Sequence, residues 1–595
     1  MPGKLIALVV SALLVLAPVA SSAADTFRLV VRGGGGDLRD AVETASLLSA
    51  SRGDATADPR DVLAAARADY ARILNALYSQ GYYGGIVRIL VDGREAAEMP
   101  AFSAPTRIGS IRIEVVPGRR FRFATAEITP LAPGTTLLPQ FSRGEVASST
   151  VIRDAVAAAI AGWRDAGRAK VQVAGQRVVA DHRDQTLDAQ VTLAPGPVVT
   201  FGRLLQSTRS AVRAGRIARI AGLPTGETFS PQALDEATGR LRRTGAFSSV
   251  TMSEAEALGP AGTLDIELSV ADQKPRRFGF GVGLSSLDGL SATAFWIDRN
   301  LLGGAERLRF DAELSDITGA LPGMDAAVTA RIDVPAALGT DTGAFVTAEA
   351  EYRDDPAYRL RQTGIGLGLQ RRFSSRLEGE AAVAFRYSTA NDDLGSRQFS
   401  VLSVPASATW DGRDSLLDPT SGIYLRADFE PFTVTSGGVS GARARLEGRS
   451  YIATAEDRLV FAGRAQLGSV IGAGVTQVPP DFLFFSGGDG RVRGFPYQSL
   501  GAGVGGNTIG GSAFLGVSAE LRFRASETIG AVAFSDAGHV GANGLFGSGS
   551  DWQVGAGIGL RYYTGIGPIR LDLAAPVSGP GGRGAQIYIG IGQAF

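Results

Sequence analysis

Charged residues gather in one part of the sequence where their spacing could build a buried ion pair. The cationic segment Arg491-Val492-Arg493-Gly494-Phe495 lies in a long stretch from about Gly472 to Gly511. Glu520 follows on a segment of alternating apolar and polar residues, and Phe534-Ser535-Asp536-Ala537-Gly538 lies on the next. Because a planar guanidinium suits bidentate capture of carboxylates, an arginine could be held between Glu520 and Asp536. A solvated surface arginine is the alternative, and charge counting alone favours it.

The composition leaves little material for other chemistry. The chain has no cysteine and two histidines, His182 and His539, and neither stands at the spacing of a nucleophile or a metal site. No GK[ST] triplet is present, which excludes a P-loop. Lys plus Arg equals Asp plus Glu at 59 each, so no global basic field favours nucleic acid. We therefore expect no catalytic residue, cofactor, metal or nucleic-acid partner.

The elements that must position these residues are short strands. From residue 275 to 595, segments that alternate apolar with small or polar residues recur between Gly, Asp, Asn and Pro, and we count sixteen of them. This period of two is typical of strands between lipid and a polar lumen. We predict a 16-stranded antiparallel transmembrane β-barrel, closed because no backbone group can face lipid unpaired. The alternative is a soluble β-sandwich, in which the apolar faces meet each other.

Residues 1–24 have the pattern of a signal peptide. One basic residue, a short apolar stretch and several small residues succeed one another there, which is typical of a cleaved secretory signal. A buried helix is the alternative. No later run of 18 or more apolar residues appears, so we expect no membrane-spanning helix.

Between the signal and the strands, the sequence predicts tandem α+β units. Pro117-Gly118 and Pro195-Gly196 each precede an apolar helical pattern, and Gly167 and Gly245 end those patterns at the same distance. Ser230 and Pro231 fit the start of the second helix. A third copy lies upstream and lacks the Pro-Gly pair. The alternative to a repeat is that common Gly and Pro residues recur at this spacing by coincidence. The predicted units span 25–117, 118–195 and 196–274, and the barrel spans 275–595.

Several motifs resemble those of the BamA/TamA superfamily of outer-membrane assembly factors. Arg493-Gly494-Phe495 is similar to its (V/I)RG(F/Y) motif, and Phe534-x-Asp536-x-Gly538 to its FxDxG motif. Further similarities span the barrel: Asp411-x-x-Asp414 with Pro419-Thr420-x-Gly422, Arg561-Tyr562 with Gly567-Pro568, and the terminal aromatic Phe595. The tandem units resemble POTRA domains. Three of them are typical of the TamA branch, whereas BamA carries five and two-partner secretion translocators carry two.

The resemblance implies a role in the bacterial outer membrane, with the POTRA domains in the periplasm. Members insert or translocate other outer-membrane proteins, autotransporters especially, through a weak seam between the first and last strands of the barrel in the lipid bilayer. The TamA branch also works with a long inner-membrane-anchored partner, TamB. The alternatives are a two-partner secretion pore for a dedicated exoprotein and a passive porin.

Glycines independently point to a weak seam. They occur on one face of the first strand and one face of the last, at Gly279, Gly281, Gly283, Gly590 and Gly592, before the end at Phe595. Each glycine inside a strand destabilises it by roughly 0.5–1 kcal/mol. An opened seam exposes an edge that can template an incoming strand. The alternative is ordinary packing, in which a small residue makes room for an inserted loop.

Overall fold

The chain forms two compact units in the computed structural model. The described residues are 26–51, 58–100, 107–285, 289–315, 317, 323–454, 458–504, 507–542, 544, 551–565, 567–582 and 584–595, so the predicted signal peptide lies outside them. One unit is Met1–Gly202, Thr225–Pro231 and Ala257–Leu264, and the other is Arg203–Pro224, Gln232–Glu256 and Asp265–Phe595. None of the described helices combines the length and apolar character needed to cross a membrane.

The amino-terminal elements are helices and short strands. The helices are α1 (Gly35–Ala45), α2 (Leu47–Ala50), α3 (Pro59–Ser79), η1 (Ala96–Glu98), α4 (Ser149–Asp165), α5 (Ala214–Ala221), α6 (Pro231–Arg243) and η2 (Pro260–Gly262). The strands are β1 (Thr26–Val31), β2 (Ile86–Val91), β3 (Arg94–Glu95), β4 (Ser110–Val116), β5 (Arg122–Thr129), β6 (Gln172–Asp181), β7 (Thr186–Ala194), β8 (Thr200–Gln206), β9 (Phe247–Glu254) and β10 (Thr263–Asp272). They form three small sheets with the orders β1-β4-β2-β3, β5-β7-β6 and β8-β10-β9.

The sequence signals that punctuate these helices are found where predicted. Gly167 and Gly245 follow α4 and α6 with φ of +81° and +69°, in the left-handed region that ends a helix. Helix α6 begins at Pro231, as predicted. The pattern missed α1, α2 and α5, which are short or begin in a glycine run and so carry little periodic signal. The unit boundaries stay a prediction.

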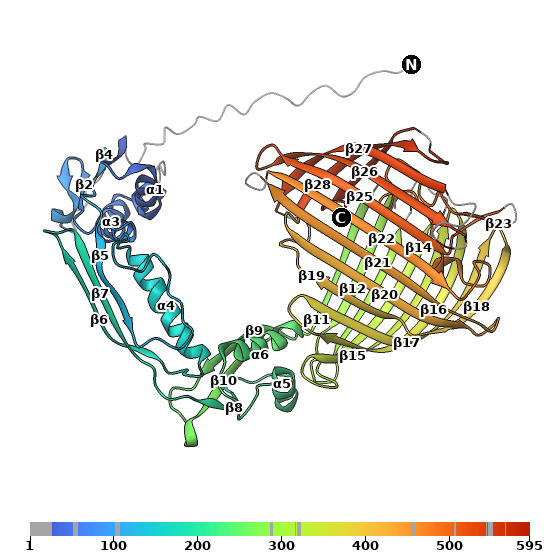
Figure 1. Cartoon of the computed structure of the whole chain (residues 1–595), viewed down its shortest axis with the longest axis horizontal. Helices are drawn as coiled ribbons and strands as arrows, with labels where there is room; N and C mark the ends of the chain where they lie inside the picture. Colours follow the sequence, from blue (N-terminus) through green and yellow to red (C-terminus); the bar gives the residue numbers. More distant parts are fainter. Residues whose placement is uncertain are drawn as a thin grey trace, which may run out of the picture. The chain divides into compact units, whose positions relative to one another are not determined.

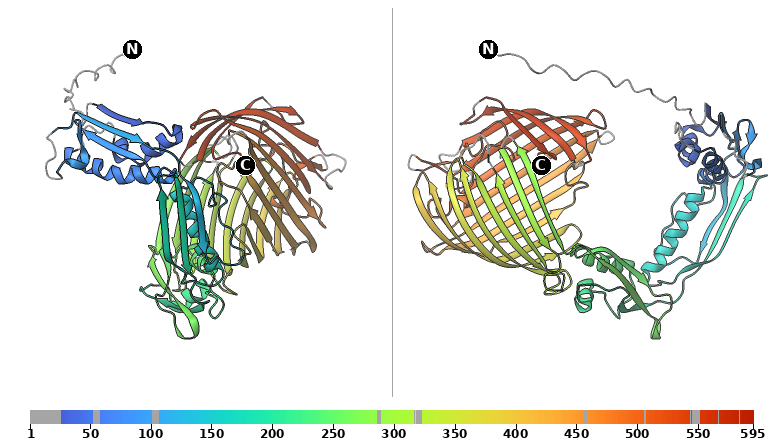
Figure 2. Two further views of the ribbon diagram at one scale, coloured as in Figure 1. Left: turned by 60° about the vertical axis from the view of Figure 1, so that its left-hand side comes forward. Right: turned by 180° about the vertical axis from the view of Figure 1, so that it is seen from behind.

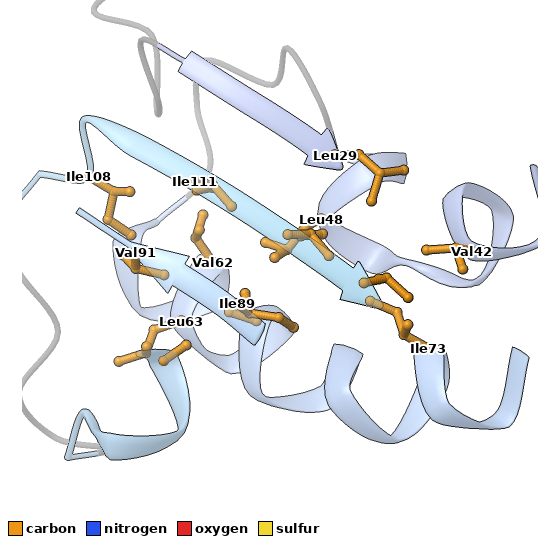
Figure 3. Close-up of a cluster of buried hydrophobic side chains, with 14 of the residues drawn as sticks. Leu29, Val42, Leu48, Val62, Leu63, Ile73, Ile89, Val91, Ile108 and Ile111 are labelled. Carbon is orange, nitrogen blue, oxygen red and sulfur yellow. The ribbon is translucent and has the colours of Figure 1, made fainter. Parts of the chain in front are cut away.

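The first small sheet has its own hydrophobic core. Leu63 and Ile73 of α3 belong to one buried cluster with Ile89 of β2 and Ile111 of β4 (Figure 3). Val42 of α1 lies in the same cluster. The helix periodicity of 3.6 and the strand periodicity of two therefore bring their apolar faces together.

The second half of the chain is one large antiparallel sheet. Its strands are β11 (Arg276–Ser285), β12 (Gly289–Asp298), β13 (Arg307–Ser315), β14 (Asp325–Val334), β15 (Thr342–Asp355), β16 (Tyr358–Arg372), β17 (Leu377–Asp392), β18 (Gly395–Ser403), β19 (Ala406–Asp411), β20 (Gly422–Val434), β21 (Val439–Thr454), β22 (Leu459–Ile471), β25 (Ala513–Arg524), β26 (Ile529–Gly541), β27 (Asp551–Thr564), β28 (Gly567–Ser578) and β29 (Gln586–Ile591). They are joined in this order (Figures 1 and 2). The intervening β23 (Ala502–Val504) and β24 (Asn507–Ile509) pair only with each other, and η3 (Pro480–Phe482) precedes them.

The sheet has 17 strands, one more than the sixteen predicted. The difference arises at Val404-Pro405, where one position in the sheet is divided into β18 and β19, and both pair with β17 and β20. Pro405 has no N–H to donate to the ladder, so the strand is interrupted there. The interruption is local, because the Pro405 carbonyl still accepts a hydrogen bond from Ala382 at 2.9 Å.

The two faces of the sheet have opposite character. One face carries large exposed apolar side chains, such as Ile365, Leu367 and Phe461. The other, which we call the inner face, carries Arg–carboxylate pairs two residues apart on single strands: Arg309–Asp311, Arg331–Asp333, Glu351–Arg353, Arg426–Asp428, Glu447–Arg449 and Glu520–Arg522. A soluble sandwich would bury the apolar face and expose the charged one. This arrangement is the reverse and suits an apolar solvent outside.

The sheet curls so that distant strands meet (Figure 1). Gln593, which follows β29, donates its N–H to the Leu417 carbonyl between β19 and β20, at 3.1 Å. The end strands β11 and β29 approach to within 8 Å between Cα atoms. Among the described residues, however, no hydrogen-bonded pairing joins β11 to β29.

The outward side chains of β11 reflect a missing neighbour. Phe278, Phe280 and Val282 are 78%, 84% and 74% exposed, whereas Ile365 and Leu367 of β16 are 59% and 62% exposed. Strand β16 is flanked on both sides, and β11 pairs only with β12 among the described residues. On the sides away from β12 and β28, the end strands are therefore edges for which the described residues provide no ladder partner.

Candidate functional site: a loop held inside the curled sheet

The long segment between β22 and β25 enters the concavity of the sheet. Its two ends, which we call the loop base, are apolar and pack on inner-face side chains near one end of the strands. The loop-base residues are Val475, Val478, Phe482, Leu483, Phe484, Phe485, Leu500 and Ile509, and the sheet contributes Tyr358, Leu360, Phe399, Val401, Phe432, Val434, Val470, Phe514 and Val540. The ring of Phe482 meets that of Phe432 edge-on at 5.0 Å. Burial of apolar surface therefore holds the loop base in place.

The loop tip, residues 491–495, reaches a carboxylate site. Arg493 is 2% exposed and binds Asp536 of β26 through both carboxylate oxygens, with Nε–Oδ2 2.7 Å and Nη2–Oδ1 3.1 Å. Its Nη1 lies 2.8 Å from Glu520 Oε1 of β25. The same nitrogen lies 3.0 Å from Asp572 Oδ2 of β28. The structure thus brings together the predicted Arg493, Glu520 and Asp536, and it adds a third carboxylate.

Additional arginines balance these carboxylates. Arg522 Nε donates to Glu520 at 2.9 Å, and Arg561 binds Asp572 from β27. Arg570 contacts Asp572 at 3.6 Å and also pairs with Asp489 of the loop. Four arginines and four carboxylates form this network, and its central members are nearly inaccessible to solvent. Buried charges are tolerated only when paired and hydrogen-bonded, which this arrangement achieves.

Sequence reasoning did not place Asp572, Arg522 or Arg570 at this site, and it named Arg561 only as part of a motif similarity. A usable signal exists for each, because every one alternates with outward apolar residues on its strand, as Asp572 does between Leu571 and Leu573. The alternation shows that these side chains point to the inner face of the sheet. It does not show which strands the loop tip contacts.

The loop tip packs against one aromatic ring and against glycines, which allow its backbone to approach the strands closely. Phe534 lies under the Arg493 guanidinium, with 3.5 Å between Cζ and the ring centroid, a close cation–π contact. A Cβ on Gly494 would come within 2.7 Å of the Ala575 carbonyl carbon, and one on Gly538 within 2.6 Å of the Val492 side chain. Gly494 also donates its N–H to the Tyr588 hydroxyl of β29 at 2.9 Å. Phe495 is buried beside it at 1% exposed.

Strand β27 clears space for the same segment. A Cβ at Gly555 would overlap the Arg493 carbonyl oxygen, and one at Gly559 would overlap the Asp572 carboxylate. The glycines that make room for the loop tip therefore include inner-face positions of β26 and β27, outside the two end strands.

Four of the six predicted seam residues lie in the end strands of the sheet. Gly279, Gly281 and Gly283 lie in β11 and Gly590 lies in β29. A Cβ at Gly279 would come within 2.6 Å of the Phe295 ring, and one at Gly281 within 2.9 Å of Thr293 Oγ1, so packing within the sheet accounts for these two. A Cβ at Gly590 would lie 3.0 Å from Arg570 Nε. Their contribution to a weak seam stays a prediction.

The placement of Gly592 on the last strand was wrong, and Phe595 lies away from that strand. Strand β29 ends at Ile591, and Gly592 has φ of +89°, so the chain turns there instead of continuing the alternation. Phe595 is 5% exposed and packs against Tyr451 and Ala462. The ring therefore packs on inner-face residues of β21 and β22, a contact that the sequence pattern of β29 cannot reveal.

The chemistry available at this site is ionic and steric. Within the described ranges, no group of three or more His, Cys, Asp or Glu side chains is placed to hold a metal ion. His539 is buried and stacks on Trp552 with 4.8 Å between ring centroids. The arrangement holds a loop inside the sheet by ion pairs at its tip and apolar contacts at its base.

Comparisons with known proteins agree with this architecture. A family model described as the Omp85 superfamily domain matches residues 270–595. A SAM50-like protein of Schizosaccharomyces pombe is 22% identical over 393 residues, which cover 60% of this chain and 81% of that protein. BamA from Haemophilus ducreyi lacking POTRA domains 1–3 is 18% identical with a TM-score of 0.63, and the match covers 79% of this chain and 99% of that chain. CdiB from Escherichia coli is 16% identical with a TM-score of 0.46, over 83% of this chain and 92% of that chain.

The family match spans every strand of the large sheet and the loop that carries Arg493, and it accounts for more than half of the chain. The BamA likeness extends the shared fold to part of the amino-terminal half. The chain therefore belongs to the Omp85 superfamily.

Proposed function

We propose that this protein assembles other proteins into the bacterial outer membrane through a seam between β11 and β29. In this proposal the sheet closes into a barrel across the bilayer, its apolar outer face meets lipid, and the amino-terminal units are POTRA domains in the periplasm. Family membership and the outward apolar face support this location. No covalent step or cofactor is needed.

One observation carries the proposal: β11 and β29 approach each other, yet no ladder joins them among the described residues. Unpaired N–H and C=O groups on a strand edge can accept a further strand. An incoming client strand would pair with β11 or β29 by β-augmentation, so that the client meets lipid with its backbone groups already satisfied.

A finer assignment follows from the sequence. We propose that the protein is of the TamA type, with three POTRA domains, autotransporter-type clients and a long TamB-like partner anchored in the inner membrane. Three small sheets precede the large one, which supports this assignment.

Tying the seam tests the proposal. A cysteine at Phe278, Phe280 or Val282 would be combined with one at Ile587, Ile589 or Ile591, in a chain that has no cysteine of its own. We expect the oxidised seam pairs to stop assembly of an autotransporter barrel, measured by protease protection of the client, and we expect reduction to restore it.

A matched pair tests whether a disulfide alone is harmful. Ala294 and Ala312 lie directly opposite each other on β12 and β13, which are already paired, so Ala294→Cys with Ala312→Cys should leave assembly unchanged. Client assembly at the normal rate with the seam oxidised would refute the proposal. A large steady conductance from that tied protein would instead indicate a passive pore.

A further inference from the structure

Residues 592–595 leave the sheet after β29 and settle on the inner face. The Gly592 N–H donates to the Pro568 carbonyl at 2.7 Å, and the Gln593 side chain donates to Asp418 Oδ1 at 2.9 Å. Asp418 belongs to the turn between β19 and β20, which Asp414 stabilises by accepting the Thr420 N–H at 3.0 Å. The turn is thus one of the supports of segment 592–595.

Two arginines of the ion network hold the same segment. Arg561 Nε donates to Gln593 Oε1 at 2.8 Å, and Arg522 Nη2 donates to the main-chain oxygen of Phe595 at 2.9 Å. The Phe595 ring lies beside the Arg464 and Arg522 guanidinium groups, 5.0 and 5.5 Å from their Cζ atoms. Both network arginines therefore contact segment 592–595 and a carboxylate at once.

Glu520 and Asp572 are shared between these two arginines and Arg493 of the loop tip. Glu520 gives Oε1 to Arg493 and Oε2 to Arg522. Asp572 gives Oδ2 to Arg493 at 3.0 Å and Oδ1 to Arg561, and its Oδ2 also lies 3.5 Å from Arg561 Nη2. Asp536 differs, because both of its oxygens bind Arg493 and no other arginine contact to it is found among the described residues.

We propose that Glu520 and Asp572 are positioning residues that couple the loop tip to segment 592–595, so that the segment stays inside only while Arg493 is bound. When Arg493 withdraws, Glu520 Oε1 and Asp572 Oδ2 each lose the hydrogen bond from its Nη1. Arg522 can then bind both oxygens of Glu520, and Arg561 can shorten its 3.5 Å contact with Asp572 Oδ2, since a bidentate pair is stronger than a single charge-assisted bond. The N–H groups that hold Phe595 and Gln593 turn away, and the segment is released.

This coupling rests on the proposed function in one respect: release of segment 592–595 would free the end of β29, the strand that borders the seam. Tyr588 of β29 already contacts Gly494 of the loop tip, so the loop tip also acts on this strand directly. In this proposal, withdrawal of the loop tip and loosening of β29 therefore occur together.

A cysteine pair reports the position of the segment without any client. Ala594 packs against the cluster that contains Ala462, so Ala462→Cys with Ala594→Cys should form a disulfide readily in the purified full-length protein. Adding Arg493→Gln should lower the disulfide yield several-fold. Asp536→Asn, which weakens the loop tip and leaves the shared carboxylates intact, should lower it less and serves if the first variant does not fold.

Arg386→Gln is the matched control. Arg386 pairs with Glu430 and stacks on Phe482 at 4.7 Å, so it disturbs the loop base without touching the shared carboxylates, and the yield should not change. An unchanged yield in folded Arg493→Gln or Asp536→Asn protein, or an equal fall in Arg386→Gln, would overturn the coupling. Because the disulfide needs no client, failure of the seam experiment would leave this result standing.

Discussion

The loop between β22 and β25 is held by apolar packing at its base and by ion pairs at its tip. The loop base buries aromatic and aliphatic side chains against other apolar side chains, a contact that has little directional demand. The loop tip places one guanidinium among three carboxylates, where each hydrogen bond has its own geometry. The base therefore keeps the loop inside the sheet, whereas the tip fixes one position of it and can be switched by moving a single residue.

Removing the central cation should have the largest effect. Arg493→Ala leaves Asp536 unpaired and deprives Glu520 and Asp572 of a shared partner, and removal of one member of a buried ion pair destabilises a protein by roughly 3–5 kcal/mol. The midpoint of denaturant unfolding in detergent should fall accordingly.

A surface pair gives the contrast. Arg309 and Asp311 are 41% and 42% exposed, so Arg309→Ala should change the free energy of unfolding by only about 0–1 kcal/mol. Equal midpoints for the Arg493 and Arg309 variants would show that the tip is not a buried ionic lock.

Filling the space reserved for the loop tip should have a smaller effect. A methyl group at Gly555 would overlap the Arg493 carbonyl oxygen, so Gly555→Ala should destabilise the protein by roughly 1–3 kcal/mol through overpacking. Gly463 lies in β22 with open space around its Cβ position, and Gly463→Ala should be neutral or slightly stabilising. If both variants unfold at the wild-type midpoint, the loop tip does not need the clearance on β27.

A conservative change in the base should have the smallest effect. Leu483 is buried in the apolar cluster, and Leu483→Met keeps volume and apolar character, so the loss should stay below about 1.5 kcal/mol. The same unfolding measurement applies. A loss as large as that of Arg493→Ala would mean that the base is as geometrically demanding as the tip, and the contrast between the two would fail.

Much of this organisation could be predicted from local sequence. Alternation placed Glu520 and Asp536 on the face where the structure has them, because the side-chain direction in a strand follows from position alone. The helix ends at Gly167 and Gly245 were equally local. These features depend on residues close together in the chain.

The remainder depends on partners far apart in sequence. Ile587, Ile589 and Ile591 form a pattern that continues smoothly to Gly592, and nothing in it marks the turn. The turn is fixed by Pro568, Leu417 and Arg522, which come from other parts of the sheet. The third carboxylate, Asp572, was missed for the same reason, since its strand could be identified but its proximity to Arg493 could not.

The paired charges on the inner face have an electrical consequence. Each arginine that lies two residues from a carboxylate on the same strand forms a short dipole, whose field decays faster with distance than that of a free ion. Neighbouring strands repeat this cancellation around the concave surface. If the sheet closes as proposed, any conductance along its inner face should therefore distinguish weakly between small cations and anions, in contrast to a channel ringed by charge of one sign.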